Sequence, residues 1–220
     1  MKFTPGTTSR GTDHVFLADI LEGEIIFGDM SAGSELIECS LMQRCDAKRH
    51  TIRSMIEELI GRGIVVKQRG RSAHLKTFTP IEVDELYHMR AVIHREAVRI
   101  MPLPAATADY ETAIDAGAPP LQIHGLNDAF HNQLFALSRN TLLCEMIAAL
   151  NRRSALIRSH GITRPDWLAV ARREHAQIIL LLERGDRENL MHLVVEHMLP
   201  TRRIWEETHA ESATMNKEER

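Results

Sequence analysis

Apolar residues between positions 13 and 63 recur every three to four positions in three separate runs. This spacing places them on one face of a helix, and each run starts beside a residue that caps helices well. We therefore expect three helices, from Asp13 to about Gly28, from Ser34 to about Cys45 and from Asp46 to Gly61. Two short β-prone segments follow, Ile64 to Lys67 and Ala73 to Phe78, and the tight turn between them predicts a small hairpin.

The pattern after position 78 is helical and begins with a capping signal. Thr79 and Glu82 form a capping box around Pro80, and the long helix that begins here is expected to end at Pro102 and Pro104. Residues 103–119 are rich in Ala, Pro and Gly and leave room for at most one short helix. Further helices are expected over Leu121 to Leu137, Thr141 to Ser159, Asp166 to Leu182 and Arg187 to about Glu207. Their short connections make them antiparallel neighbours in an all-α bundle.

The elements divide the chain at about residue 78. We expect a flexible lead-in over residues 1–12, a first domain over 13–78, an all-α domain over 79–207 and a polar tail over 208–220. The predicted fold class is mainly α, a three-helix domain with a hairpin followed by an antiparallel helical bundle.

Composition narrows the class of protein. Of 220 residues, 44% are apolar and 26% are charged, which is typical of a globular protein and excludes a disordered chain, a collagen-like fibre and a coiled-coil rod. Three cysteines without a CxxC pair support neither a disulfide framework nor a thiolate zinc site, so a reducing cytoplasm is the expected compartment. The apolar run Ile178 to Leu182 is far shorter than the ~20 residues of a membrane span, so no membrane partner is expected.

Positive charge is concentrated in one segment. The formal net charge is −3, yet nine basic residues stand against three acidic ones between Arg44 and Lys76. Arg49 and Arg53 share a helix face, while the apolar stripe from Ile52 onward points elsewhere. An isolated basic helix is as often a solvated surface, but a short helix before it and a hairpin after it are typical of a winged helix-turn-helix, whose second motif helix enters the major groove.

The same segment resembles the GntR family of bacterial transcription regulators. The resemblance rests on Leu36 to Met42, on KRHTIRSMIEELIGRGIV (Lys48 to Val65) and on Arg69 with Gly70. It implies DNA contacts by Arg44, Lys48, Arg49, His50, Thr51, Arg53, Arg69 and Gly70. Lys48 stands where Ser or Thr is usual and Cys39 where an operator-contacting Arg is common, so we expect an operator sequence different from the common family site.

Histidines form a second constellation. His175 is ten residues before Gly185 and His197 is eleven after Asp186, so both lie about 15 Å from the turn between two helices and can face each other. Asn127 and His131, four residues apart, share a face of an earlier helix. Three imidazoles and an amide oxygen suit zinc, nickel or another first-row divalent metal and leave positions for a further ligand. Taken singly, each histidine could instead be a hydrogen-bonded packing residue.

These residues resemble the FCD domain, the all-α ligand-binding domain of the FadR-type subgroup. NDAFHNQLFALSRN (Asn127 to Asn140), REHAQIILLLERGD (Arg173 to Asp186) and His197 stand in that family's order. Metal-binding members carry Asp at the position of Asn127, and Glu is usual at the position of His94. The resemblance implies that the first helix of the domain lines the pocket, which makes Arg90 the candidate for an effector's carboxylate. Five other histidines show no partner in the sequence pattern and are expected to have solvated or packing roles: His88, His124, His160, His192 and His209.

The two resemblances together imply a homodimeric regulator of double-stranded operator DNA, controlled by a small organic acid bound at or near a divalent metal. Two alternatives stay open. The same regulator could hold its effector in a metal-free pocket, or the metal could activate water in a hydrolase. Against an enzyme, Asp128 is the nearest candidate base and is expected to point away from the ligands.

Overall fold

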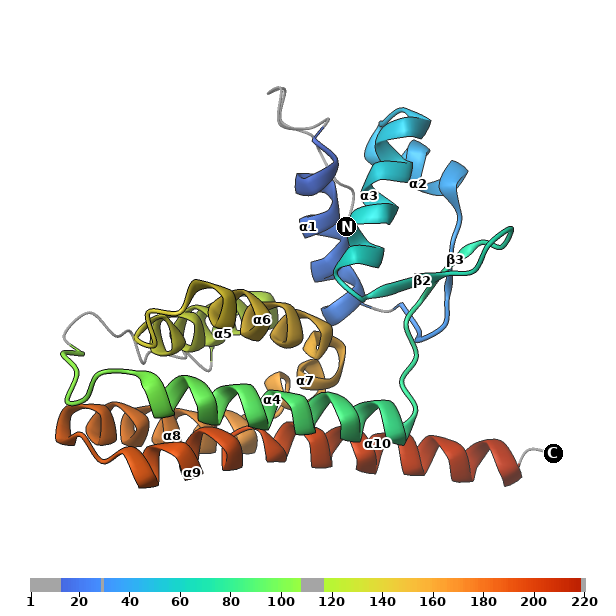
Figure 1. Ribbon diagram of the computed structural model, residues 1–220. Coiled ribbons are helices and arrows are strands. Elements are labelled where there is room, and N and C mark those ends of the chain that lie inside the picture. Colours follow the sequence, from blue (N-terminus) through green and yellow to red (C-terminus); the bar gives the residue numbers. More distant parts are fainter. Residues whose placement is uncertain (1–12, 29, 108–116, 219–220) are drawn as a thin grey trace. The chain divides into compact units, whose positions relative to one another are not determined.

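The computed structural model describes residues 13–28, 30–107 and 117–218, and the side chains only as far as residue 209 (Figure 1). Contacts between Cα atoms divide the chain into two compact units, residues 1–78 and 79–220. The lead-in expected over residues 1–12 lies outside the described residues. In the described part of the chain, no helix is both long enough and apolar enough to cross a membrane.

The first unit has three helices and a small sheet. Its elements are α1 (His14–Phe27), β1 (Glu35–Leu36), α2 (Glu38–Cys45), α3 (Arg49–Gly61), β2 (Val65–Lys67) and β3 (Ala73–Leu75). Asp13 caps α1 by accepting a hydrogen bond from the Val15 N–H. The apolar faces of α1 and α2 pack against α3, whose Ile52, Met55 and Leu59 are fully buried. The core therefore holds α3 fixed while its other face remains exposed.

The sheet contains a strand that the sequence pattern did not predict. The strand order is β1-β3-β2, both pairs are antiparallel, and Leu36 lies opposite Ala73. The prediction of a helix starting at Ser34 was wrong, because residues 35 and 36 hydrogen-bond to β3 and Leu36 is buried against the core. Asp46 does not cap α3 either. Its backbone is left-handed, with φ of 47°, and ends α2, while Lys48 is the N-cap of α3.

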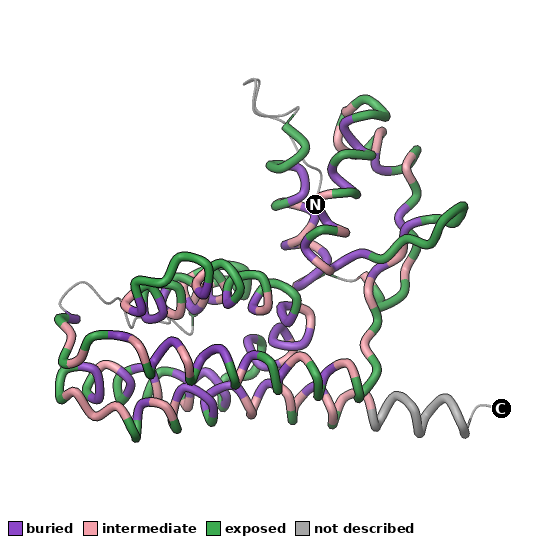
Figure 2. The backbone as a smooth tube through the Cα atoms, viewed as in Figure 1, coloured by how far each residue is buried: buried purple, intermediate pink, exposed green. Residues whose placement is uncertain are grey.

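The second unit is entirely helical in its described residues. Its elements are α4 (Pro80–Ile100), α5 (Pro120–Ala136), α6 (Thr141–Arg153), α7 (Ala155–Ile162), α8 (Pro165–Arg184), α9 (Arg187–Glu196) and α10 (Leu199–Glu218). The capping box of Thr79 and Glu82 starts α4, as predicted. Helix α4 packs against α6 and α9, α8 packs against α9, and α7 packs against α10. Buried and exposed positions alternate along α4, as expected of a helix with one face in the core (Figure 2).

Two predicted helices are each broken in the structure. The helix expected over Thr141 to Ser159 ends at Arg153, where the Ser154 hydroxyl donates to the Asn151 carbonyl at 2.9 Å, a competing side-chain bond that favours a bend. The helix expected to run on from Arg187 stops at Glu196, because Pro200 lacks the N–H that would continue it. Helix α10 then extends to Glu218, beyond the helix end expected at about Glu207.

Candidate functional site

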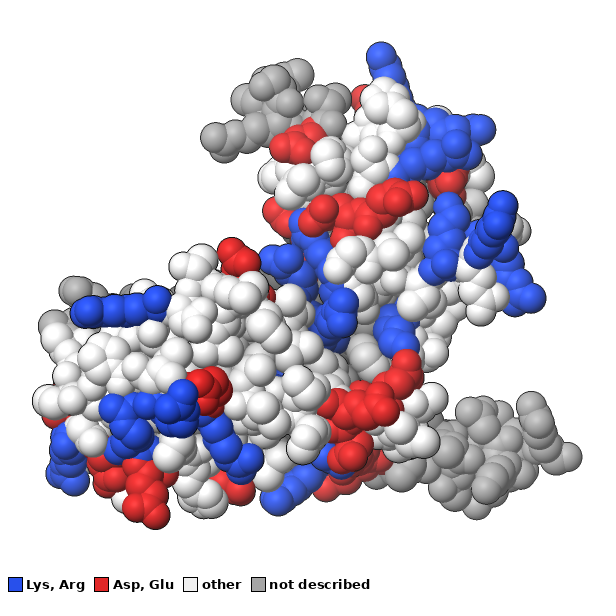
Figure 3. Space-filling view, viewed as in Figure 1, with Lys and Arg blue, Asp and Glu red and all other residues white. Residues whose placement is uncertain are grey.

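The basic face of the first unit lies on the start of α3 and on the hairpin. Lys48, Arg49 and His50 are exposed at the amino end of α3, and Arg69, Gly70 and Arg71 are exposed at the turn between β2 and β3. Figure 3 shows Lys and Arg gathered over these elements. Gly70 has φ of +75°, a backbone conformation that glycine adopts without strain, so it allows the tight hairpin. Both projections of a winged helix-turn-helix thus carry positive charge.

Two of the predicted DNA-contacting arginines are held in ion pairs within the first unit. Arg53 Nε lies 3.1 Å from Glu38 Oε2 and 3.2 Å from Glu38 Oε1, so α2 positions the side chain that projects from α3. Arg44 forms an ion pair with Glu24 of α1. Both pairs are largely exposed, so solvent and salt weaken them.

Thr51 does not belong to the exposed basic face. It is 7% exposed and lies on the core side of α3, with its hydroxyl 3.4 Å from His50 Nε2. In the sequence, Thr51 follows the exposed Arg49 and His50 and precedes the buried Ile52. Its position alone therefore does not show whether it faces the core or the solvent. The exposed face of α3 is formed instead by Arg49, His50 and Arg53.

Three histidines meet in the second unit. His131 is on α5, His175 is on α8 and His197 follows α9, and one ring nitrogen of each lies within 4.8 Å of the others. His175 Nε2 is 3.1 Å from His197 Nε2. Two nitrogens bound to one zinc at about 2.0–2.1 Å lie about 2.9–3.4 Å apart at ordinary bond angles, so the spacing of His175 and His197 fits a shared metal.

His131 and His175 are held neutral, as metal ligands must be. Burial, and then the neighbouring His197, lower the pKa of His175 to about 2. Burial also lowers the pKa of His131 well below its ordinary value, and His197 and His175 lower it further. The His175 ring stacks on Phe130 with centroids 3.9 Å apart, which fixes its orientation.

Glu174 orients one of these imidazoles, a role that the sequence analysis missed. Its Oε2 accepts a hydrogen bond from His197 Nδ1 at 2.6 Å, which leaves Nε2 of His197 facing the other histidines. A carboxylate behind a ligating imidazole fixes its tautomer and raises its basicity. In the sequence, the only signal was a glutamate next to His175. The hydrogen bond itself joins residues 23 positions apart, so local spacing could not predict it.

Asn127 supplies an unused oxygen beside the cluster. It is 4% exposed, it lines the same pocket as His131 and His197, and its Oδ1 is buried with no hydrogen-bond partner among the described residues. Leaving a buried amide oxygen unpaired costs free energy, so a ligand for it is favoured. The three imidazoles and this oxygen therefore fit a divalent metal.

Asp128 is turned to other partners. Its two oxygens accept from Arg158 Nη1 at 2.7 Å and Nη2 at 3.3 Å, and His124 Nε2 lies 3.4 Å from it. Although burial opposes it, Arg158 holds the pKa of Asp128 below its ordinary value. With Asp128 bound to Arg158 and Glu174 bound to His197, both carboxylates near the cluster are already engaged.

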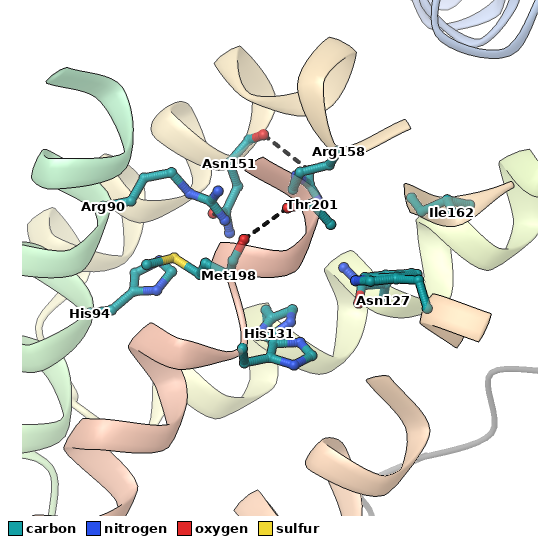
Figure 4. Close-up of a pocket in the computed structure, with 11 residues that line it drawn as sticks. Arg90, His94, Asn127, His131, Asn151, Arg158, Ile162, Met198 and Thr201 are labelled. Carbon is teal, nitrogen blue, oxygen red and sulfur yellow. Dashed lines mark hydrogen bonds between the residues drawn. The ribbon is translucent and has the colours of Figure 1, made fainter. Parts of the chain in front are cut away.

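The pocket continues beyond the histidines to a polar end. Figure 4 shows Arg90, Asn151 and Arg158 grouped on the side away from His131, with Thr201 and Met198 between. Arg90 was predicted from the sequence, and it does line the pocket. Arg158 also lines it, as do His94 and Asn151, which were not predicted as site residues. They come from α4, α6 and α7, so only the fold brings them together.

Three of the five other histidines have partners that the sequence pattern did not indicate. His124 pairs with Asp128, and the His160 and His209 rings lie edge to face with centroids 5.8 Å apart. His209 also donates from Nδ1 to the Trp205 carbonyl. These partners lie one helical turn away or on another helix.

Comparisons with known proteins show one matching domain family and several solved structures with a similar fold. The family model of the FCD domain matches residues 85–199. A protein from Rhodococcus sp. RHA1, described as a transcriptional regulator GntR, has a TM-score of 0.71 and 21% identity over 90% of this chain and 98% of its own. McbR/YncC from E. coli has a TM-score of 0.68 and 18% identity over 92% of this chain and 100% of its own. A GntR family member from Pseudomonas syringae pv. tomato str. DC3000 has a TM-score of 0.52 and 20% identity over 92% of this chain and 88% of its own. No curated protein matches the sequence.

Proposed function

The chain belongs to the FCD domain family, and on that premise we propose that it is a transcription regulator that binds operator DNA with its first unit and a small effector with its second. The observation that carries this proposal is the exposed positive charge at the amino end of α3 and at the β2–β3 turn. These are the two parts of a winged helix-turn-helix that approach DNA. Lys48 contacts a phosphate, while Arg49 and Arg53 read or anchor the major groove.

The regulator acts as a homodimer on an operator with twofold symmetry. Each first unit carries few exposed basic side chains, so one copy neutralises too few phosphates for tight binding. Two copies contact two half-sites about one helical turn apart. We propose that it works in the bacterial cytoplasm, at the nucleoid, and that it is not an enzyme.

A divalent metal, zinc or another first-row ion such as nickel, is the proposed cofactor. His131, His175 and His197 would hold it with Asn127 as a weak fourth ligand, and the ion would supply positive charge for an anionic effector. Glu174 positions His197 for this role, and the orphaned Asn127 oxygen supports it. The effector is a small organic acid whose binding changes the spacing of the two DNA-binding units.

The experiment is selection of DNA from a random library by the purified full-length protein, followed by fluorescence anisotropy at fixed salt. We expect enrichment of an inverted repeat bound by two chains. Arg49→Ala should weaken that binding by about 1–3 kcal/mol, while the matched control Arg172→Ala, an exposed arginine of α8, should not. Failure to enrich any sequence, or a single half-site bound by one chain, would contradict the proposal.

The cofactor is tested separately by elemental analysis of the purified protein and by zinc titration calorimetry of wild type and His175→Ala. We expect about one metal per chain in wild type and a large loss of affinity in the variant. If neither protein binds zinc, the pocket is metal-free and the histidines and Asn127 contact the effector directly.

A further inference from the structure

The polar end of the pocket contains a buried positive charge that the protein does not neutralise. Arg90 is 4% exposed and its Nη2 donates to Asn151 Oδ1 at 3.2 Å. Its Nε and Nη1 are buried without a hydrogen-bond acceptor in the described part of the chain. Its guanidinium lies over the Tyr87 ring, 4.9 Å from the centroid, which supports the charge only partly.

Arg158 adds a second guanidinium at the same place. It is 5% exposed, its Nη2 donates to the Asn151 carbonyl at 3.0 Å, and its Nε is buried without an acceptor among the residues described. Asn151 thus joins the two arginines through its side chain and its backbone. Asp128 neutralises one of the two charges, so the pair keeps one net positive charge.

The residues around Arg90 favour a bound anion, and not another protein group, as the partner of its charge. His94 lines the same end, and burial, followed by the nearby Arg90 charge, lowers its pKa well below the ordinary value, so it is neutral. Burial lowers the pKa of Arg90 itself to about 10, which shows how unfavourable its lone charge is. A buried charge without a counterion is costly. Two arginines that line one pocket have three nitrogens without an acceptor among the described residues, and these match the oxygens of an oxyacid.

We infer that the effector carries two anionic groups, one at the histidine cluster and a second that binds between Arg90 and Arg158. The second group is a carboxylate or a phosphate, since a guanidinium binds either in the same forked geometry. The inference rests on the proposed effector function of the second unit. It adds that a monocarboxylate is an incomplete ligand, and it makes Arg90 and Arg158 the residues that determine specificity.

The test is titration calorimetry of the zinc-loaded full chain with ligands matched in length. The probes are straight-chain dicarboxylates from malonate to adipate, the monocarboxylates with the same numbers of carbons, and phosphonocarboxylates of the same lengths. We expect at least one dianion to bind at least about tenfold more tightly than its monocarboxylate, which corresponds to about 1.4 kcal/mol. Whether that dianion is a dicarboxylate or a phosphonocarboxylate identifies the second group.

Arg90→Met should remove this preference, because the dianion then loses the guanidinium that binds its second anionic group. The matched control, Arg172→Met on the surface of α8, should retain the preference. If every monocarboxylate binds the wild type as tightly as its dianion, the inference is wrong while the proposed function stands. If zinc binds but no carboxylate does, the inference and the proposed organic-acid effector are both wrong, whereas the proposed DNA binding is decided by the DNA selection. Because the comparison of ligands uses the wild type, it decides the question even if the variant does not fold.

Discussion

Arg53 on α3 is ion-paired with Glu38 on α2, with Nε 3.1 Å from Oε2. The arginine expected to enter the DNA groove is therefore already ordered by the protein, next to a carboxylate that repels phosphates. DNA binding has to compete with this pair or make use of the position that it gives to Arg53.

Glu38→Gln should strengthen binding to non-operator DNA, because it removes a negative charge from the basic face and releases Arg53. An exposed pair contributes about 0.2–1 kcal/mol, so the expected gain is several-fold at most and shrinks with added salt. Anisotropy with a random duplex at two salt concentrations measures it. Glu57→Gln, an exposed charge-matched change on α3, is the control, and an equal gain in both variants would show that the pair itself has no effect.

Glu174→Gln should weaken zinc binding by about 10–100-fold, because a carboxylate behind a ligating imidazole contributes that much. The ligands themselves remain, so zinc should still bind at higher concentration. Competition with a colorimetric chelator measures the affinity. The exposed Glu188→Gln on α9 serves as the control, and zinc affinity that is unchanged in Glu174→Gln would mean that the hydrogen bond to His197 Nδ1 is structural only.

Asn127→Asp should raise zinc affinity and lower the affinity of the zinc-loaded protein for an anion. A carboxylate is a stronger ligand than an amide oxygen, and its charge offsets part of the positive charge that attracts the effector. Calorimetry with zinc and then with the best dianion measures both effects. A rise in both affinities would show that anion binding does not depend on the charge of the metal.

The free energy of unfolding of the second unit should decrease as the pH is lowered, partly because of His124, which lies beside Arg158 and Asp128. Burial and then Arg158 lower its pKa to about 4 from 6.5, against the opposing effect of Asp128. Between pH 6.5 and about 4 the unfolded chain binds a proton that the folded chain does not, so the free energy of unfolding falls as the pH falls. The contribution of His124 reaches about 1.4 kcal/mol one unit below its ordinary pKa.

His124→Gln should reduce this pH dependence without removing the contributions of other groups. Urea unfolding at pH 7.5 and pH 5.5 measures it, and tryptophan fluorescence follows the second unit selectively because Trp167 and Trp205 both belong to it. An identical loss of stability in wild type and variant would contradict the low pKa. His192→Gln, at an exposed position on α9, is the control.

Elements whose signals lie within one helical turn could be predicted from the sequence. Asp13 and the Thr79–Glu82 box act on neighbouring backbone groups, and both caps form as expected. Strand β1 could not be predicted, because its two residues become a strand only by pairing with β3, 37 positions later. The spacing of His175 and His197 about a turn was readable, whereas the bond between Glu174 and His197 depends on how two helices are rotated.

The break at Ser154 has a consequence for how ligand recognition could change in evolution. At this junction the Asn151 carbonyl accepts from both Ser154 Oγ and Arg158 Nη2, while the Asn151 side chain holds Arg90. A substitution at Ser154, which is fully buried at the junction of α6 and α7, would therefore rotate the arginines without replacing either one. Regulators that keep both arginines could in this way diverge in the acids they recognise through a helix junction alone.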